Sequence, residues 1–322
     1  MPSLTASLSR LLPFLLISNI VVAQKESPFD GLSVISDSDI RDSAIAFVNT
    51  TTAPGLEGAT LNVNNNDQRD SDQWRSSLGF TAEITLKDHI FNAYWGLGLV
   101  GGSLSDNIRL TADNGQQVTL DLRRDIISLR GTLGLVFPVN EHFKLRPVLT
   151  LSVSDMRTKT VIDGLYTINN TPTARTFRNS AQLASGTGSL DALFWYWHND
   201  YRLELSGHYN LIYTDSFSKD NPILDTYAWD QTAQIKSRIS GPTSLISHSR
   251  PWRWVAYANH TNFLTQDKVS LGYTGLFEIG TGLEWQINVK PLDWFGWQYI
   301  GISAGVITSR NVDGFNVGLT AR

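Results

Sequence analysis

The chain has 322 residues, of which 41% are apolar, 17% charged and 11% aromatic, so it can bury a core and is not disordered by composition. Its formal charge of -4 and its pI near 5.9 give no sign of the concentrated basic face that a nucleic-acid partner requires. The mean hydropathy of -0.14 excludes a bundle of membrane helices. Because cysteine is absent, disulfides, thiolate metal sites and cysteine nucleophiles are excluded. No other motif in the sequence predicts a metal site or a cofactor.

Residues 1–23 have the layout of a secretory signal peptide. One positive charge precedes an apolar stretch from Leu11 to Val22, and the small residue Ala23 closes it. About a dozen apolar residues are too few to cross roughly 30 Å of hydrocarbon as a helix, which argues against a membrane anchor. We therefore expect an exported chain that crosses a membrane, if at all, with strands.

Residues 24–55 form a lead that contains one candidate helix, over 36–48. Three residues can cap it, Ser36, Asp37 and Ser38. Its apolar residues fall on one helical face, at Ile40, Ala44, Phe47 and Val48. Thr50 to Thr52 and Pro54 are expected to end it. The alternative for this stretch is a disordered tether.

From Trp74 onward the apolar residues recur at every second position, the period of a strand. The clearest tract alternates Tyr201, Leu203, Leu205, Tyr209 and Leu211 with Arg202, Glu204, Ser206, His208 and Asn210. A soluble sandwich also alternates, but its strands average five or six residues, whereas a tilted membrane strand needs about nine to eleven. The tracts here run about ten to thirteen residues, which favours a membrane barrel.

Twelve strands are predicted, an even number, within a barrel domain over residues 56–322. They cover approximately 56–64, 74–86, 90–101, 118–137, 143–154, 187–198, 201–213, 227–240, 244–258, 269–287, 297–307 and 314–322. Short turns are expected at 87–89, 138–142, 198–200 and 241–243, and long polar loops at 102–117, 155–186, 214–226 and 259–268. The fold class is therefore all-β: a transmembrane antiparallel up-and-down barrel with a short N-terminal helix in or near its lumen.

Aromatic residues are expected at both edges of the apolar band. Tyr201 and Tyr213 stand at the two ends of one predicted strand, and Trp195 and Trp197 flank the turn that Tyr201 leaves. Further rim aromatics are predicted at Tyr227, Trp229, Trp252, Trp254, Trp294, Phe295, Trp297 and Tyr299.

The alternation directs many charged side chains toward the lumen. The positive ones are Arg75, Arg124, Arg130, Lys144, Arg146, Arg202, Lys236, Arg238 and Arg253. The negative ones are Glu83, Glu204, Asp230, Glu278 and Glu284. These groups must pair or stay hydrated, because an isolated buried charge is too costly. The acidic start of the candidate helix, Asp37, Asp39 and Asp42, would offset the positive excess if the helix enters the lumen as a plug.

These features resemble the barrel of the autotransporters, and most closely the solitary outer membrane autotransporter-like β-barrel proteins. The resemblance rests on the signal peptide, the short lead and twelve-strand alternation, and it implies a helix threading the pore. It also implies insertion by the barrel-assembly machinery into a membrane of lipid and lipopolysaccharide. Residues 24–55 are too few for a passenger domain. The chain departs from such barrels at its end, Phe315, Val317, Leu319, Ala321 and Arg322, which alternates but lacks a terminal aromatic residue.

Catalytic constellations are scarce. Ser247, His248 and Ser249 are adjacent, but neighbours on a strand point to opposite faces, so they do not predict a triad. The leading hypothesis is a non-catalytic outer-membrane barrel whose role lies in its exposed loops or plugged pore. The alternatives are a small-solute or weakly anion-favouring channel and, third, an outer-membrane hydrolase.

Overall fold

The computed structural model describes residues 37–54, 58–65, 69–87, 89–111, 115–168, 171–220, 225, 227–265, 272–287 and 298–321. Within them the chain forms one helix, α1 (Asp37–Thr52), and twelve strands. The strands are β1 (Ala59–Asn65), β2 (Arg69–Ile84), β3 (Asn92–Thr111), β4 (Gln117–Asn140), β5 (Phe143–Ile168), β6 (Thr171–His198), β7 (Tyr201–Lys219), β8 (Tyr227–Ser247), β9 (Arg250–Phe263), β10 (Gly275–Gln286), β11 (Tyr299–Ser309) and β12 (Val312–Ala321). The signal peptide predicted for 1–23 lies outside the described residues. In the described part of the chain, no helix is long and apolar enough to cross a membrane.

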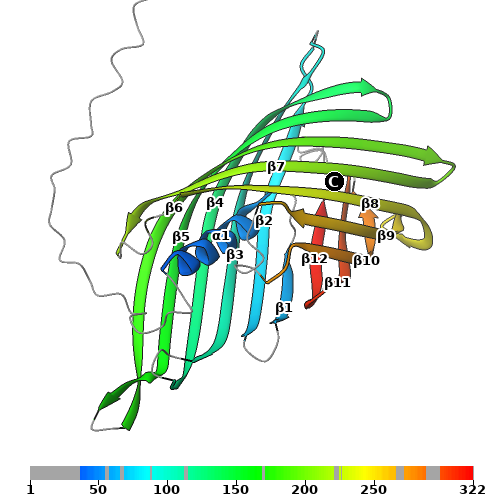
Figure 1. Ribbon diagram of the computed structural model, residues 1–322. Helices are drawn as coiled ribbons and strands as arrows, with labels where there is room; N and C mark the ends of the chain where they lie inside the picture. Colours follow the sequence, from blue (N-terminus) through cyan, green and yellow to red (C-terminus); the bar gives the residue numbers. More distant parts are fainter. Residues whose placement is uncertain are drawn as a thin grey trace, which may run out of the picture.

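The strands form one closed sheet in which each strand pairs antiparallel with its neighbours in the chain. The ring closes where β1 pairs with β12. Figure 1 shows the strands tilting around the barrel, with α1 inside the ring. The predicted fold class, a twelve-strand antiparallel up-and-down barrel, is confirmed.

The two faces of the sheet differ in polarity over a band in the middle of the barrel. On β4 the outward side chains of this band are apolar and exposed, with exposed fractions of 60% for Ile127, 59% for Leu129 and 68% for Leu133. The inward residue Ser128 between them is buried. A closed sheet pairs the backbone groups of neighbouring strands with each other, and an apolar exterior can face lipid; together these features allow strands to cross a bilayer.

Aromatic side chains mark both edges of this band. Near the short turns, Tyr201 and Trp254 pack with ring centroids 6.3 Å apart. Trp197 faces the lumen instead, where the guanidinium groups of Arg202 and Arg253 lie 5.4 and 5.2 Å from its ring centroid. At the other end of β7, the strand of Tyr201, Tyr213 packs on Trp229 at 4.9 Å. Twelve residues correspond to about 40 Å along a strand, or about 30 Å at a tilt near 40°, close to the height of an apolar band between two aromatic girdles. Trp294, Phe295 and Trp297 lie outside the described residues.

The prediction of long polar loops at 102–117 and 155–186 is wrong, because these segments are the outer parts of long strands. The hairpin of β5 and β6 extends furthest from the barrel, at the lower left of Figure 1. In the outer parts of β4 and β5 the alternation is inverted: Val118, Leu120 and Leu122 of β4 and Ile162 of β5 form a buried inner cluster, while most of the outward side chains are polar. Beyond the membrane, the outer face of a strand contacts water and is polar, while its inner face can stay apolar. Polar residues in such a segment therefore do not indicate a loop.

Other boundaries also differ from the prediction. The expected loops at 214–226 and 259–268 begin later, because β7 continues to Lys219 and β9 to Phe263. The expected turn at 241–243 is an irregularity inside β8, where the register shifts between Pro242 and Ile246 because proline cannot donate to the ladder. The turn itself lies at His248 and Ser249, whose φ angles are 53° and 60°. We call the rim with the connections β2–β3, β4–β5, β6–β7 and β8–β9 the turn rim, and the opposite one the far rim.

The first strand is unusually short. β1 has seven residues and pairs with Arg69–Arg75 of β2. On its other side only four residue pairs join it to β12, from Thr60–Phe315 to Val63–Val312. Among the described residues, Ser76–Ile84 of β2 and Asn316–Ala321 of β12 have no strand between them. This gap faces the turn rim (Figure 1).

Candidate functional site

The lumen holds α1, and the helix is buried on all sides from Ser43 to Thr52. Its apolar seat lies against β3 to β6, where Phe47 and Val48 pack in one cluster. The cluster consists of Ala44, Phe47, Val48, Leu104, Ile126, Met156, Ala181 and Leu183. A plug that presents apolar side chains to an apolar part of the lumen removes both from water, which stabilises its position.

The other side of the helix carries polar contacts. Asn49 donates through Nδ2 to a carboxylate oxygen of Asp230 on β8. The Oγ1 hydroxyl of Thr214 on β7 donates to Oδ1 of Asn49 at 2.5 Å. All three side chains are buried, so each of these hydrogen bonds satisfies a group that water does not reach.

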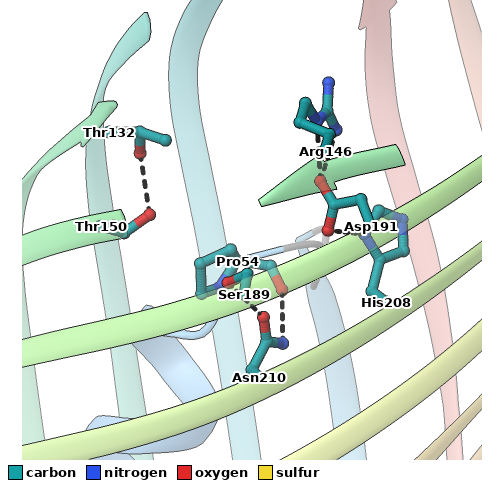
Figure 2. Close-up of polar contacts among 8 residues, drawn as sticks. All are labelled: Pro54, Thr132, Arg146, Thr150, Ser189, Asp191, His208 and Asn210. Atoms are coloured by element: carbon teal, nitrogen blue, oxygen red, sulfur yellow. Dashed lines mark hydrogen bonds and ion pairs between the residues drawn. The ribbon is translucent and has the colours of Figure 1, made fainter. Parts of the chain in front are cut away.

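Further hydrogen bonds join the helix to other strands. Arg75 of β2 donates from Nη1 to the backbone carbonyl of Thr50 at 3.0 Å. Arg124 of β4 donates from Nη1 to Oγ of Ser43 at 2.9 Å. Beyond the helix end, Nδ2 of Asn210 on β7 donates to the carbonyl of Pro54 at 3.3 Å (Figure 2). The plug segment is therefore bonded to β2, β4, β7 and β8.

The three threonines do not end the helix, contrary to the prediction. Thr51 and Thr52 donate their hydroxyls to the carbonyls four residues earlier, at 2.7 and 2.8 Å, and Thr50 does the same at 2.8 Å. This internal bonding lets buried threonine hydroxyls stay satisfied within the helix. The helix ends before Pro54, which has no backbone N–H to continue it.

Of the three acidic side chains predicted at the N-terminus of the plug helix, the structure describes one. The side chains of Asp37 and Asp39 lie outside the described residues, and Asp42 is exposed. In the hydrogen bonds between helix and barrel described above, the helix residues are Ser43, Asn49 and Thr50.

Between the helix and the turn rim, charged side chains line the lumen in ion pairs. Lys144 lies 3.1 Å from Glu83. Glu204 lies 2.7 Å from Arg202 and 3.2 Å from Arg238, and Arg238 also contacts Glu284. These residues come from five strands, so the pairs bridge across the lumen as well as between neighbouring strands.

A second group centres on Asp191 of β6, which the sequence analysis did not single out. One of its oxygens accepts from Arg146 at 2.8 Å and the other lies 2.7 Å from Nδ1 of His208 (Figure 2). The guanidinium of Arg146 also lies 4.2 Å from the ring centroid of Tyr94, a cation–π contact. Asp191 occupies an inward position on β6. The sequence did not reveal this, because the aromatic residues from Phe194 to Trp197 interrupt the alternation nearby.

Asp106 was also missed as a lumen residue, because 102–117 was expected to be a loop. It is buried, lies 3.7 Å from Arg124, and accepts a hydrogen bond from Ser71. Arg124 is fully buried, so this carboxylate supplies the opposite charge that a buried guanidinium requires.

Three further predicted lumen cations, Arg253, Lys236 and Arg130, each make a different contact. Arg253 donates to the carbonyls of Asp200 at 2.6 Å and Ser240 at 3.1 Å. Lys236 lies 5.2 Å from the ring centroid of Tyr257. Arg130 lies against Gly98, where a Cβ atom would stand 2.9 Å from its Nε.

Glu278 accepts hydrogen bonds from Tyr257 at 2.7 Å and from Asn316 at 3.0 Å. The tyrosine reaches it across two glycines, because a Cβ at Gly280 or Gly305 would lie about 2.5 Å from the phenolic oxygen. Glu278 thereby joins β9 and β12 through side chains.

A layer of small polar side chains occupies the lumen at the level between the charges and the helix. It contains hydrogen bonds between Thr132 and Thr150 at 3.0 Å and from Ser189 to Asn210 at 2.7 Å (Figure 2). These neutral groups add hydrogen-bonded polar side chains to the lumen between the charged residues and the helix.

The adjacent serine and histidine at the β8–β9 turn do touch. Oγ of Ser247 lies 3.3 Å from Nδ1 of His248, and both stand at the turn rim. Within the described residues, no group of three or more His, Cys, Asp or Glu side chains could hold a metal ion.

No protein-family model and no curated protein matches this sequence. Among solved structures, the translocator domain of the autotransporter NalP from Neisseria meningitidis matches with a TM-score of 0.53 and 14% identity, covering 89% of this chain and 100% of that one. The β domain of the Bordetella autotransporter BrkA matches with a TM-score of 0.50 and 14% identity, covering 81% of this chain and 94% of that one. The chain therefore has the fold of the autotransporter translocator barrels.

Proposed function

We propose that this chain is an integral outer-membrane protein, a non-catalytic barrel of the autotransporter type without a passenger, whose pore is closed by its own N-terminal helix. The observation that carries the proposal is the seat of α1: the helix is buried from Ser43 to Thr52 and hydrogen-bonded to several strands. A helix of about 10 Å diameter occupies the width that solutes would need.

The membrane location is supported by the apolar outward band and its two aromatic edges. In this orientation the turn rim faces the periplasm and the long hairpins face outward. Lipid, lipopolysaccharide and the barrel-assembly machinery stay predicted partners. The absence of a passenger also stays a prediction, which the intact mass of the protein extracted from the outer membrane would check.

A channel for small solutes or anions is the second candidate. It is favoured by the half-buried cations that line the lumen between the helix and the turn rim, Lys144, Arg146, Arg202 and Arg238. In this reading the helix is a gate that leaves the lumen.

Single-channel conductance in planar bilayers tests both candidates. For the plug, we expect the full chain to be closed and a variant lacking residues 24–50 to conduct steadily. Asn49→Ala removes the contacts to Asp230 and Thr214 and should raise the frequency of openings without abolishing closure. The matched control is Asn62→Ala, which removes an exposed contact to Asp72 and should leave conductance unchanged.

The acidic start gives an independent check of the plug. If Asp37, Asp39 and Asp42 help to hold the helix, their joint replacement by Asn should loosen it in a salt-sensitive way. Steady conductance of the full chain would favour the channel. Unchanged conductance on deletion, with rapid protease cleavage at Arg41 in the intact protein, would contradict the plug.

A further inference from the structure

Three basic side chains stand in one row on the outer surface of the barrel. Arg123 of β4 is directly opposite Lys159 of β5, which is directly opposite Arg178 of β6. All three are exposed and occupy outward positions, in line with the outward residues of the apolar band. Arg157, two residues before Lys159, also faces outward and its side chain is 78% exposed. We call these four residues the basic patch.

The basic patch lies just beyond the apolar band, on the side of the far rim. The apolar band ends on these strands at Ile127 of β4 and Val153 of β5, both more than half exposed. Arg123 is four residues beyond Ile127, or about 13 Å along the strand and about 10 Å along the barrel axis at a tilt near 40°. This is the level at which the polar headgroups of a bilayer begin.

The charges of the patch are only partly balanced by the protein. Arg123 is paired with Asp125 at 3.2 Å, and Arg157 with Asp155 at 3.2 Å. Among the residues that the structure describes, Lys159 and Arg178 have no hydrogen bond or ion pair. Like charges directly opposite each other on a sheet are destabilising, so this row favours an external anion.

The patch is local. Along the same row, β3 contributes Ser105 and β2 contributes Asp72, opposite which stands Asn62 of β1. Along this row the positive charge is therefore confined to β4, β5 and β6.

We propose that the basic patch binds the phosphate groups of a glycolipid in the outer leaflet, of the lipid A type. Arginine offers planar pairs of N–H donors that match phosphate oxygens, and lysine adds a compact charge. A lipid meets both features of this surface, because its acyl chains lie against Ile127, Leu129 and Val153 while its phosphates reach the row above them. The inference rests on the proposed outer-membrane location.

Native mass spectrometry of the full chain, extracted in mild detergent, tests the patch. Lipid A with both phosphates should bind to the wild type, and Lys159→Gln with Arg178→Gln should weaken binding about tenfold. The matched control, Arg109→Gln with Arg310→Gln, removes the same charge from exposed far-rim positions and should bind like the wild type. Dephosphorylated lipid A should bind equally weakly to all three proteins.

Equal weakening by the control pair, or equal binding of dephosphorylated lipid, would overturn the proposal. Full displacement of the lipid by inorganic phosphate would also overturn it, since the ligand would then be a soluble anion. Heat-modifiable mobility on gels shows separately that each variant is folded. Membrane fractionation tests the outer-membrane location on its own, so a failure of location and a failure of the patch are distinguishable.

Discussion

Leu205 and Ser206 are neighbours on β7 whose side chains meet different surroundings. Leu205 points outward and is 41% exposed on the apolar band, near the middle of the span between Tyr201 and Tyr213. Ser206 has the opposite parity, so it points into the lumen, and its side chain is half-buried. The same substitution at these two positions therefore distinguishes a side chain that faces lipid from one that faces the lumen.

We expect Leu205→Arg to destabilise the inserted barrel by about 2 to 4 kcal/mol, the cost of an arginine at the bilayer midplane. Ser206→Arg should cost much less, because a lumen cation can stay hydrated. Urea titration of the refolded protein in lipid vesicles measures both. Equal losses would show that β7 does not have one face in lipid.

The direction of each side chain was predictable, because parity along a strand fixes its face. The partners were not. Asp191 and His208 become neighbours only through the register of β6 with β7, and Asn49 meets Asp230 only because the helix is inside the barrel. The register of two strands and the position of the helix depend on contacts between distant segments. The periodicity of one segment carries no information about those contacts.

At the scale of elements, β1 is the weak member of the sheet. It leaves Ser76–Ile84 of β2 and Asn316–Ala321 of β12 without a strand between them in the described part of the chain. Alternate backbone N–H groups of these segments then have no partner in the ladder.

Hydrogen exchange should reveal this gap. In detergent micelles, we expect alternate amides of Ser76–Ile84 to exchange faster than those of Arg69–Arg75, which β1 covers. Mass spectrometry of the exchanged protein with fragmentation resolves the two halves of β2. Uniform protection along β2 would mean that another segment covers its edge.

The number of strands was predictable and their ends were not. The apolar-out alternation counts twelve strands, but outside the membrane the alternation inverts, so the polar outer parts of β3 to β6 were interpreted as loops. The candidate helix was found from its apolar face, whereas its continuation through Thr50 to Thr52 depends on hydrogen bonds to its own carbonyls.

At the scale of the whole molecule, the lumen charges set which ions an unplugged barrel would pass. Glu204 and Glu284 lie against Arg202 and Arg238 and neutralise them. Replacing both glutamates by Gln removes two negative charges from the lumen beside these arginines, so the pore should favour anions more strongly.

We expect Glu204→Gln with Glu284→Gln, in the variant lacking residues 24–50, to shift the reversal potential under a salt gradient toward that of the anion. Asp125→Asn with Asp155→Asn removes the same charge from the outer surface and should not shift it. No shift in the lumen variant would place the ion path away from these residues.

The short β1 also constrains the order in which the molecule assembles. The four residue pairs that close the ring join segments near opposite ends of the chain, and such contacts form late because a long loop must first be ordered. Only Ala53–Gly58 separate the helix from β1, so we expect the helix to lie inside the curving sheet when the ring closes. In that order of events the plug is enclosed during assembly, and its position requires no passage through a finished pore.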